Sequence, residues 1–328
     1  MRLSTYLLFL LTTGLPSPLI LAQSTEQVAH GVRNDLPRPY TTQRDWGALP
    51  EGTQAWAAVT AVEPSPDGQF IYVIHRCFEN SCSGRPEPPI LKFDYEGELI
   101  AAFGEGLFVF PHGATVDYEG NLWVADAQGN EDIGHQVIKF NGEGEILMTL
   151  GQRGIGGNGP DLLHSPNDVV IDPEDGDVFV VDSHRRGMNN RIVHYTAEGE
   201  FIKEWGSKGS QKGQLSEPHT IAMDSKGRLF VGDRENNRIQ IFSQEGEFID
   251  EWRQFGRPSG IFITSDDRIY VADSESGPDT GAGELMGIMK GIRIGSAVDG
   301  TVDSFIAVSY THLRAHETRH ELVCRLLL

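Results

Sequence analysis

The chain has 328 residues, of which 47 are acidic and 27 are basic, so its formal net charge is −20 at pH 7. A surface this acidic repels the phosphates of a nucleic acid, which argues against a nucleic-acid partner. The sequence contains 38 glycines and 17 prolines, and 9% of its residues are aromatic. Such a content of turn-forming residues is typical of an all-β domain made of many short strands.

The first 22 residues have the character of a secretory signal. A single basic residue, Arg2, precedes an apolar run that glycine and proline interrupt. This pattern predicts a signal peptide over 1–22 with cleavage after Ala22, and a membrane anchor is the alternative. We therefore expect a secreted or periplasmic protein with no membrane contact after cleavage. Residues 23–55 are polar and proline-containing and are predicted to form an extended lead-in.

A repeated pattern of short apolar runs occupies residues 56–306. Each run has about four to six residues and most lead into a cluster of Gly, Asp, Asn or Ser, which predicts four antiparallel strands a copy. Within one copy the strands are expected at Thr220–Met223, Arg228–Val231, Arg238–Phe242 and Phe248–Trp252. Five copies are present, a degenerate one from Ala57 and four that begin at Pro111, Pro166, Pro218 and Pro258.

A single four-stranded sheet of this size cannot bury both of its faces, so the copies must stack on one another. Radial stacking leaves only short sheet edges and requires no long helix. The sequence therefore predicts an all-β fold, a β-propeller of which about five blades are present.

Two cysteines bracket a short loop in the first copy. Cys77 and Cys82 enclose the sequence CFENSC between the second and third predicted strands. In an oxidising compartment they could form a disulfide that pins this loop. Metal binding by reduced cysteines in the cytosol is the alternative.

The last stretch, 307–328, departs from the repeat pattern. It contains no Gly and no Asp, and its sequence resembles translated sequencing adapter. We interpret it as a foreign tail and expect the propeller to be truncated before its last blade. As a helix, the stretch would align His312, His316 and His320 in a metal-binding stripe, which is the alternative.

Two histidines occupy the same position in alternate copies. His112 and His219 each follow the opening proline of a copy. Because the innermost strand of a propeller blade lines the central channel, both side chains are expected to point at one axis. Imidazole suits zinc, and a catalytic zinc takes three protein ligands and leaves one position open. A zinc site and a pair of channel histidines hydrogen-bonded to water are the two interpretations.

Two arginines also share one position, just past the second predicted strand. Arg76 and Arg234 would lie at the channel mouth, where a carboxylate bound between them would balance their charge. The alternative is that each pairs with a local acid such as Asp233 or Glu235. In another copy the same position is followed by His184, which could act as an acid or a base near neutral pH.

Several motifs together resemble a known family. PHGATVD, NNRIVHY, EPHTIAM and GDRENNRIQIF are similar to the NHL-repeat propeller of the peptidyl-α-hydroxyglycine α-amidating lyases, especially their secreted bacterial relatives. The resemblance extends over residues 57–306. It implies a six-bladed propeller that holds zinc through three channel histidines and cleaves an α-hydroxyglycine into an amide and glyoxylate.

The matching motifs carry the family's site residues onto this chain. Two zinc ligands fall on His112 and His219, and the third would lie in the last blade, which we expect to be missing here. The family's substrate-binding and catalytic arginines fall on Arg76 and Arg234. Its catalytic tyrosine falls on His184, which we predict replaces it as the base.

The resemblance also implies a structural calcium ion, held partly by backbone carbonyls near Thr60 and Ala114. We predict a monomeric, zinc-dependent lyase for a small carboxylate-bearing or peptide substrate. With two protein ligands, we expect weak metal binding and low or absent lyase activity. The alternative is a non-catalytic secreted NHL propeller that binds a protein or a small ligand at the channel mouth.

Overall fold

The structure is a computed structural model that describes residues 31–41, 46–51, 53, 56, 58–184, 189–276 and 287–307. The predicted signal peptide and residues 308–328 of the predicted foreign tail lie outside this part of the chain. Within it, no helix has both the length and the apolar character needed to cross a membrane.

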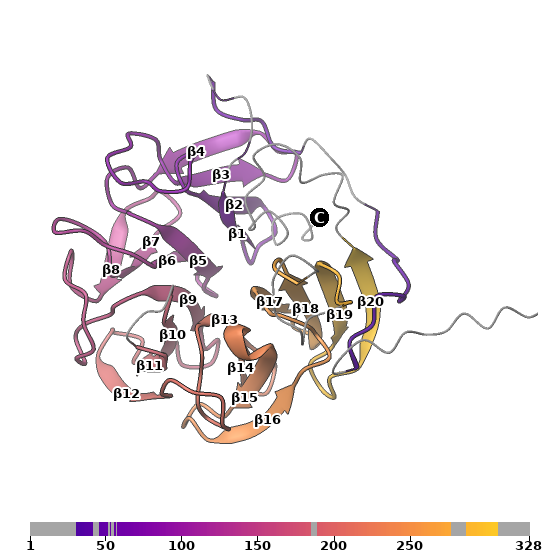
Figure 1. The fold of residues 1–328 in the computed structure, drawn as a ribbon. Helices are drawn as coiled ribbons and strands as arrows, with labels where there is room; N and C mark the ends of the chain where they lie inside the picture. Colours follow the sequence, from indigo (N-terminus) through magenta and orange to yellow (C-terminus); the bar gives the residue numbers. More distant parts are fainter. Residues whose placement is uncertain are drawn as a thin grey trace, which may run out of the picture.

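The described residues form five four-stranded antiparallel sheets, each built from strands that are consecutive in the chain (Figure 1). The first two sheets contain β1 (Val59–Pro64), β2 (Phe70–His75), β3 (Ile90–Asp94), β4 (Leu99–Phe103), β5 (Pro111–Val116), β6 (Leu122–Asp126), β7 (Val137–Phe140) and β8 (Ile146–Leu150). The third and fourth contain β9 (Pro166–Ile171), β10 (Val178–Asp182), β11 (Arg191–Tyr195), β12 (Phe201–Trp205), β13 (Pro218–Met223), β14 (Leu229–Asp233), β15 (Arg238–Phe242) and β16 (Phe248–Trp252). The fifth contains β17 (Gly260–Ile263), β18 (Arg268–Asp273), β19 (Gly291–Ser296) and β20 (Val302–Ala307).

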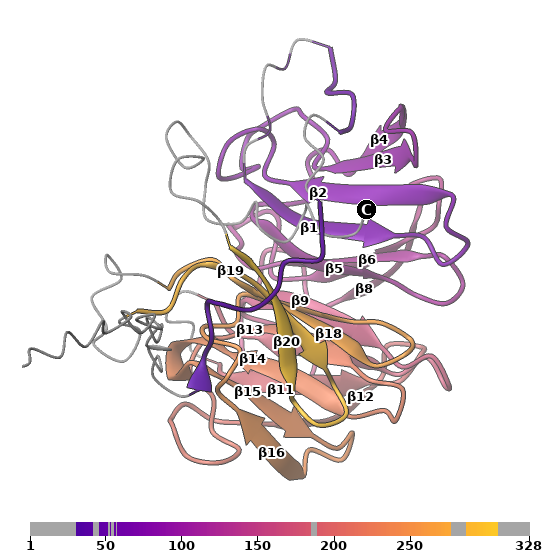
Figure 2. The same cartoon turned by 90° about the vertical axis from the view of Figure 1, so that its right-hand side faces the viewer.

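The five sheets are the blades of a β-propeller, which confirms the predicted fold class. The first strand of each sheet lies nearest the centre, and these strands contact one another in the order β1, β5, β9, β13, β17 (Figures 1 and 2). Among the described residues, β17 and β1 make no comparable contact. Three of the repeated prolines open β5, β9 and β13, and Pro258 lies two residues before β17.

An aspartate ends the second strand of four blades and binds the segment of chain that leads into the innermost strand. The carboxylate of Asp182 accepts backbone hydrogen bonds from His164 and Ser165, which precede the innermost strand of the same blade. Asp233 accepts the equivalent bond from Ser216. These buried backbone donors need partners, and the repeated aspartate supplies them.

An arginine at the third strand neutralises this aspartate in the last three blades. The buried pairs have N–O distances of 3.0, 2.8 and 3.7 Å and are Arg191–Asp182, Arg238–Asp233 and Arg293–Asp273. A buried carboxylate is tolerated when it is paired and hydrogen-bonded. The Asn-Asn-Arg motifs in the sequence are therefore structural parts of the repeat.

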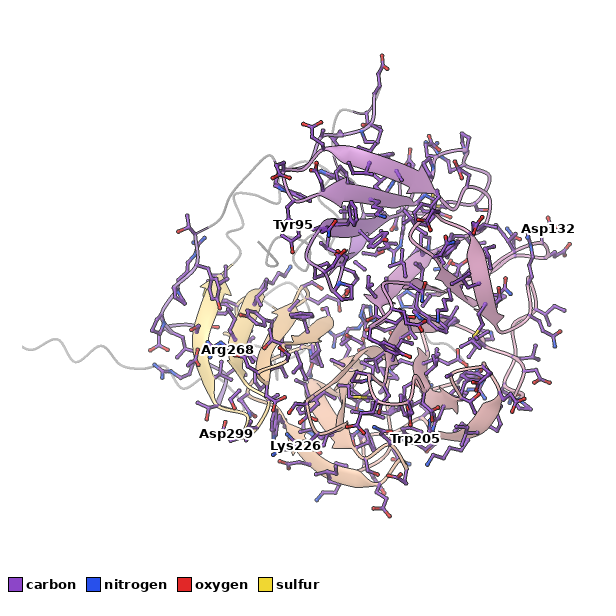
Figure 3. All side chains as sticks on the ribbon, turned by 180° about the vertical axis from the view of Figure 1, so that it is seen from behind. Tyr95, Asp132, Trp205, Lys226, Arg268 and Asp299 are labelled. Carbon is purple, nitrogen blue, oxygen red and sulfur yellow. A yellow bond between two sulfur atoms is a disulfide. The ribbon has the colours of Figure 1, made fainter. Side chains whose placement is uncertain are left out.

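Apolar side chains fill the space between neighbouring blades. One cluster joins Phe179 and Val181 of β10 to Leu229 and Val231 of β14, and all four side chains are fully buried. Each sheet thus buries side chains on both faces, as the radial arrangement requires. Charged residues lie on the outer surface, with Asp132 and Asp299 at opposite edges in Figure 3.

The lead-in contacts both the first and the fifth blade. The backbone N–H of Phe305 donates to the carbonyl of Pro37, and the Tyr40 and Tyr270 hydroxyls are 3.0 Å apart. Trp46 packs against Phe93 of the first blade, with ring centroids 5.6 Å apart. Figure 2 shows the indigo segment running across the side of β20. The described part of the predicted lead-in is therefore an extended strap with specific contacts.

Candidate metal centre and active site

His112 and His219 lie where the repeat placed them, as the second residue of β5 and of β13. Both side chains are buried, and their ring centroids are 4.6 Å apart. Each follows a proline at the start of the innermost strand, next to an irregularity in the strand pairing. The two imidazoles therefore lie next to each other, edge to face, which agrees with the predicted convergence of the two side chains.

Backbone carbonyls determine which ring nitrogen is protonated in these two imidazoles. Nδ1 of His112 is 2.8 Å from the carbonyl oxygen of Asn167, and Nδ1 of His219 is 2.7 Å from that of Ser259. A carbonyl oxygen only accepts, so Nδ1 carries the proton in both rings. The lone pair is then on Nε2, which is the form that ligates a metal while the other nitrogen donates to a backbone group.

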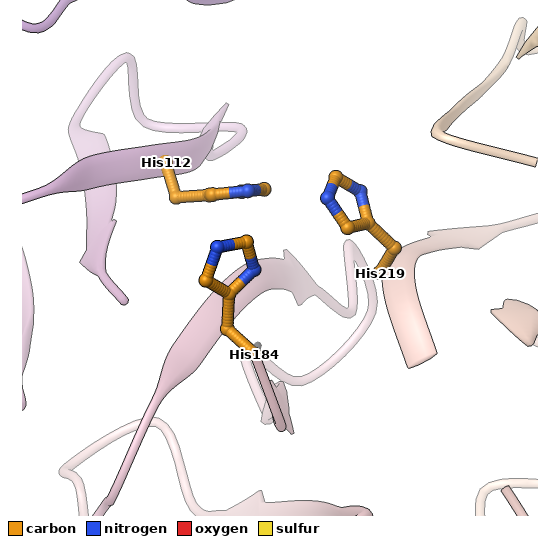
Figure 4. A group of neighbouring side chains, drawn as sticks. All are labelled: His112, His184 and His219. Carbon is orange, nitrogen blue, oxygen red and sulfur yellow. The ribbon is translucent and has the colours of Figure 1, made fainter. Parts of the chain in front are cut away.

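His184 is the third imidazole at this place. It follows β10 of the intervening blade and is buried. Its ring centroid lies 4.7 Å from that of His112 and 5.7 Å from that of His219. Figure 4 shows the three rings converging from three separate strands and loops.

The three histidines could bind a metal ion. One nitrogen from each ring lies within 4.8 Å of the other two. Ligand nitrogens of a tetrahedral zinc are about 3.3 Å apart, so side-chain movements of about 1 Å would complete the site. From the sequence we expected two candidate ligands, His112 and His219. The structure brings a third histidine, His184, close to them. The strand alternation could not predict this, because His184 lies on a loop past the end of β10.

Arg76 lies beside the histidine cluster. Its guanidinium carbon is 3.4 Å from the centroid of the Phe110 ring, and that ring is also 5.5 Å from His184. Nε of Arg76 donates to the carbonyl of Pro111, the residue before His112, at 3.2 Å. Arg76 is thus buried and held at the start of the strand that carries a candidate ligand.

Arg234 is held by acidic side chains. Its Nη2 is 3.1 Å from Glu217, two residues before His219, and its Nη1 is 3.7 Å from Glu275. Glu235 lies 3.9 Å away, whereas Asp233 pairs with Arg238. The alternative of pairing with local acids therefore describes the Arg234 contacts seen here. Its predicted role in binding substrate stays a prediction.

A buried carboxylate supports the loop that carries Phe110. Asp126 accepts backbone hydrogen bonds from Val109 and Phe110 at 2.8 and 2.6 Å. Burial raises the pKa of Asp126 to about 7, while these hydrogen bonds and the nearby Arg76 oppose the rise. The Phe110 backbone is thus fixed directly beside the candidate site.

A disulfide shapes the loop that follows Arg76. Cys77 and Cys82 are bonded, and their Cα atoms are 5.2 Å apart. The backbone N–H of Phe78 donates to Nδ1 of His75 at 3.1 Å, and burial lowers the pKa of His75 to about 4. His75 is therefore a neutral structural histidine near neutral pH.

A partly open cavity of about 200 Å³ lies in the channel at the histidines. His112, His219, Thr60 and Ala114 are among the residues that line it. The calcium ion expected near Thr60 and Ala114 stays a prediction. Two acids, Glu63 and Asp168, also line this cavity. They were not predicted from the sequence, because they lie inside apolar strands and share no motif.

Both channel acids have raised pKa values. Burial raises the pKa of Asp168 to about 7, although the backbone N–H of Ile221 donates to its carboxylate at 2.9 Å. Burial, and then the charge of Asp168, raise the pKa of Glu63 well above its ordinary value. Glu63 is partly buried and lines the cavity.

The fold is a β-propeller, and part of its fourth blade matches a known repeat family. A family model described as NHL repeat matches residues 215–242. Over 144 residues, the chain is 37% identical to peptidyl-glycine alpha-amidating monooxygenase B of Xenopus laevis, which covers 42% of this chain and 16% of that protein. The chain is also 33% identical over 145 residues to a probable peptidyl-alpha-hydroxyglycine alpha-amidating lyase of Caenorhabditis elegans, covering 43% of this chain and 39% of that protein.

A third relative has no catalytic name. Human NHL repeat-containing protein 3 is 31% identical over 151 residues, which are 45% of this chain and 43% of that protein. The chain therefore spans less than half of the length of these three relatives. Its homology is to amidating monooxygenases and lyases and to NHL-repeat proteins.

Solved structures agree on the fold. A gluconolactonase of Xanthomonas campestris has a TM-score of 0.53 at 13% identity, with 77% of this chain and 76% of that chain covered. The nidogen/laminin complex gives a TM-score of 0.55 at 14% identity, with coverages of 77% and 81%. At sequence identities this low, the similarity supports the propeller fold and does not support a shared function.

Proposed function

We propose that this propeller is a zinc-dependent lyase that cleaves the C–N bond of an α-hydroxyglycine and releases an amide and glyoxylate. One observation carries the proposal. Buried imidazoles with inward-facing nitrogen atoms lie beside a buried arginine at one end of the channel, in a chain homologous to proteins named for this reaction. In that arrangement the imidazoles would bind a metal, and the arginine would bind a carboxylate next to it.

His112 and His219 would hold the zinc ion, because both present Nε2 and donate from Nδ1 to fixed carbonyls. When bound, zinc would supply Lewis-acid stabilisation of negative charge on the substrate's hydroxyl oxygen. The donor set fits, since neutral imidazole is a preferred zinc ligand. The ring positions are set by the backbones of neighbouring blades, so little reorganisation is needed.

Arg76 would bind the substrate carboxylate. A guanidinium presents two parallel N–H groups to a carboxylate, and its flat face stacks on an aromatic ring. Phe110 provides that ring here. Arg234, which pairs with Glu217, would lie on the His219 side of the site as the second candidate for binding the carboxylate. The substrate's reacting carbon would then be oriented by its own carboxylate.

The reaction is an elimination that needs no further reactant. The hydroxyl proton leaves the oxygen, and the O–H electron pair forms the second C–O bond of glyoxylate. The C–N bond breaks, and its electron pair goes to the amide nitrogen, which takes up a proton. The resemblance predicts His184 as the group that accepts the hydroxyl proton.

The test uses a peptide that ends in α-hydroxyglycine, and the products measured are glyoxylate and the peptide amide. We expect release above the uncatalysed rate, loss of release after chelation and recovery with Zn²⁺. The matched substrate is the methyl ester of the same peptide, which Arg76 cannot bind as a carboxylate. No release above background would overturn the lyase proposal in favour of a binding propeller.

A further inference from the structure

We infer that His184 is the third metal ligand of this site and not its base. The inference rests on the proposed metal site and assigns a role within it. It differs from the role that the family resemblance implies, in which this position removes a proton. The observations behind it are the position, the chemistry and the anchoring of His184.

The three histidines come from three consecutive blades. His112 is on β5, His184 follows β10 and His219 is on β13. A nitrogen of His184 lies within 4.8 Å of a nitrogen on each of the other two rings. An ion between His112 and His219 is therefore within reach of His184 after a small rotation. Three protein ligands with one open position is the usual composition of a catalytic zinc site.

The chemistry of the two neighbouring rings favours a ligand at this place. His112 and His219 already direct Nε2 lone pairs into the space between the blades. A third imidazole nitrogen there adds another donor to the same point. A ring that donates its lone pair to a metal cannot also accept the substrate's proton. Ligation and base catalysis by the same nitrogen of His184 therefore exclude each other.

The chain next to His184 is tied to the rest of the site. Ser183 donates to the side-chain oxygen of Asn190 at 3.3 Å, and that oxygen also accepts the backbone N–H of Glu217 at 3.0 Å. Glu217 in turn pairs with Arg234. The backbone bearing His184 is thus fixed relative to the strand bearing His219. Such outer support is what orients ligand histidines in metal sites.

The first arm of the test measures metal affinity, by competition with a chromophoric chelator. We expect His184→Ala to weaken Zn²⁺ binding by more than about 100-fold, as much as His112→Ala and beyond the effect of an outer-shell change. His164→Ala, in the loop before β9, is the matched control and should bind as the parent does. Circular dichroism checks that each variant is folded.

The second arm uses a spectroscopic signature that only a ligand gives. In His184→Cys loaded with Co²⁺, a coordinating thiolate should produce a sulfur-to-cobalt charge-transfer band in the near ultraviolet. His164→Cys should not produce that band. Neither arm measures glyoxylate release, so both results are independent of the lyase activity of the protein.

The outcomes separate the two proposals. If His112→Ala loses Zn²⁺ while His184→Ala retains parental affinity and His184→Cys gives no band, the ligand role of His184 is overturned and the metal site remains. If the parent chain itself binds no Zn²⁺, the proposed zinc-dependent function falls, and the ligand role falls with it. A band together with a large loss of affinity supports the inference.

Discussion

The imidazole of His112 donates from Nδ1 to the backbone carbonyl of Asn167, the residue at the same position in the next blade. His219 makes the same contact with Ser259 one blade beyond its own. Between them, the Asn167 side chain donates to the carbonyl of Pro218 at 2.8 Å. The repeat therefore sets the orientation of both candidate ligands through contacts between neighbouring innermost strands.

This relationship makes Asn167 a supporting residue that can be tested. Asn167→Ala removes the link to Pro218, and we expect it to lower the unfolding free energy by about 1–3 kcal/mol. We also expect roughly 10- to 100-fold weaker Zn²⁺ binding, as for other outer-shell partners. Urea unfolding and chelator competition measure the two effects. Asn121→Ala, in a surface turn, is the control, and equal metal affinity in both variants would contradict the role.

The buried arginine–aspartate pairs of the repeat should carry much of the stability. Arg238→Met leaves the fully buried Asp233 carboxylate without its main partner, so we expect a loss of about 3–5 kcal/mol. Arg268→Met breaks an exposed pair with Asp303 and should cost less than about 1 kcal/mol. Urea unfolding of the two variants gives the comparison. Similar losses would mean that the buried pair is not structural.

The sequence predicted the fold and the two in-register histidines because both depend on the same repeat. Strand alternation fixes which face a residue occupies, and copies of one blade place equivalent residues at equivalent points. The bounds predicted for β15 and β16 agree with the structure residue by residue. The Cys77–Cys82 pair could be foreseen because only four residues separate the two cysteines.

Parts of the site that depend on loops and on distant contacts could not be predicted in this way. His184 lies past the end of β10, where no alternation sets its direction, and it joins the other imidazoles through the packing of three blades. Phe110 stacks on Arg76 across 34 residues of sequence. Phe110 and Glu217 each precede a Pro-His pair in the sequence. This shared position could have indicated that both residues lie near the site.

The Arg76 contacts lead to an expectation for substrate binding. Arg76→Lys keeps the charge but loses the planar fork and the stacking on Phe110. We expect kcat/KM for the α-hydroxyglycine peptide to fall by about 10- to 100-fold, mainly through KM, as for loss of a charge-assisted hydrogen bond. Steady-state kinetics on the free acid and on its methyl ester measure this. The ester should respond far less, and Arg153→Lys on an exposed loop should change neither.

The channel acids should make stability depend on pH. Burial and the charge of Asp168 raise the folded-state pKa of Glu63. The folded protein therefore loses stability as the pH rises above the pKa of an ordinary glutamate, about 4.3. Glu63→Gln cannot ionise and should be more stable than the parent near neutral pH. The gain should shrink as the pH falls toward 4, where the carboxyl is protonated in both states. Melting temperatures between pH 4 and 8 measure it, and parallel curves for the two proteins would contradict it.

The central claim is that the histidines of the channel hold a metal on which C–N cleavage depends. The most direct measurement determines bound zinc per chain and the rate of glyoxylate release in the same preparations of the parent, His219→Ala and His164→Ala. We expect the parent and His164→Ala to bind zinc and release glyoxylate, and His219→Ala to lose both together. A His219→Ala variant that releases glyoxylate at the parental rate, with or without zinc, would contradict the claim.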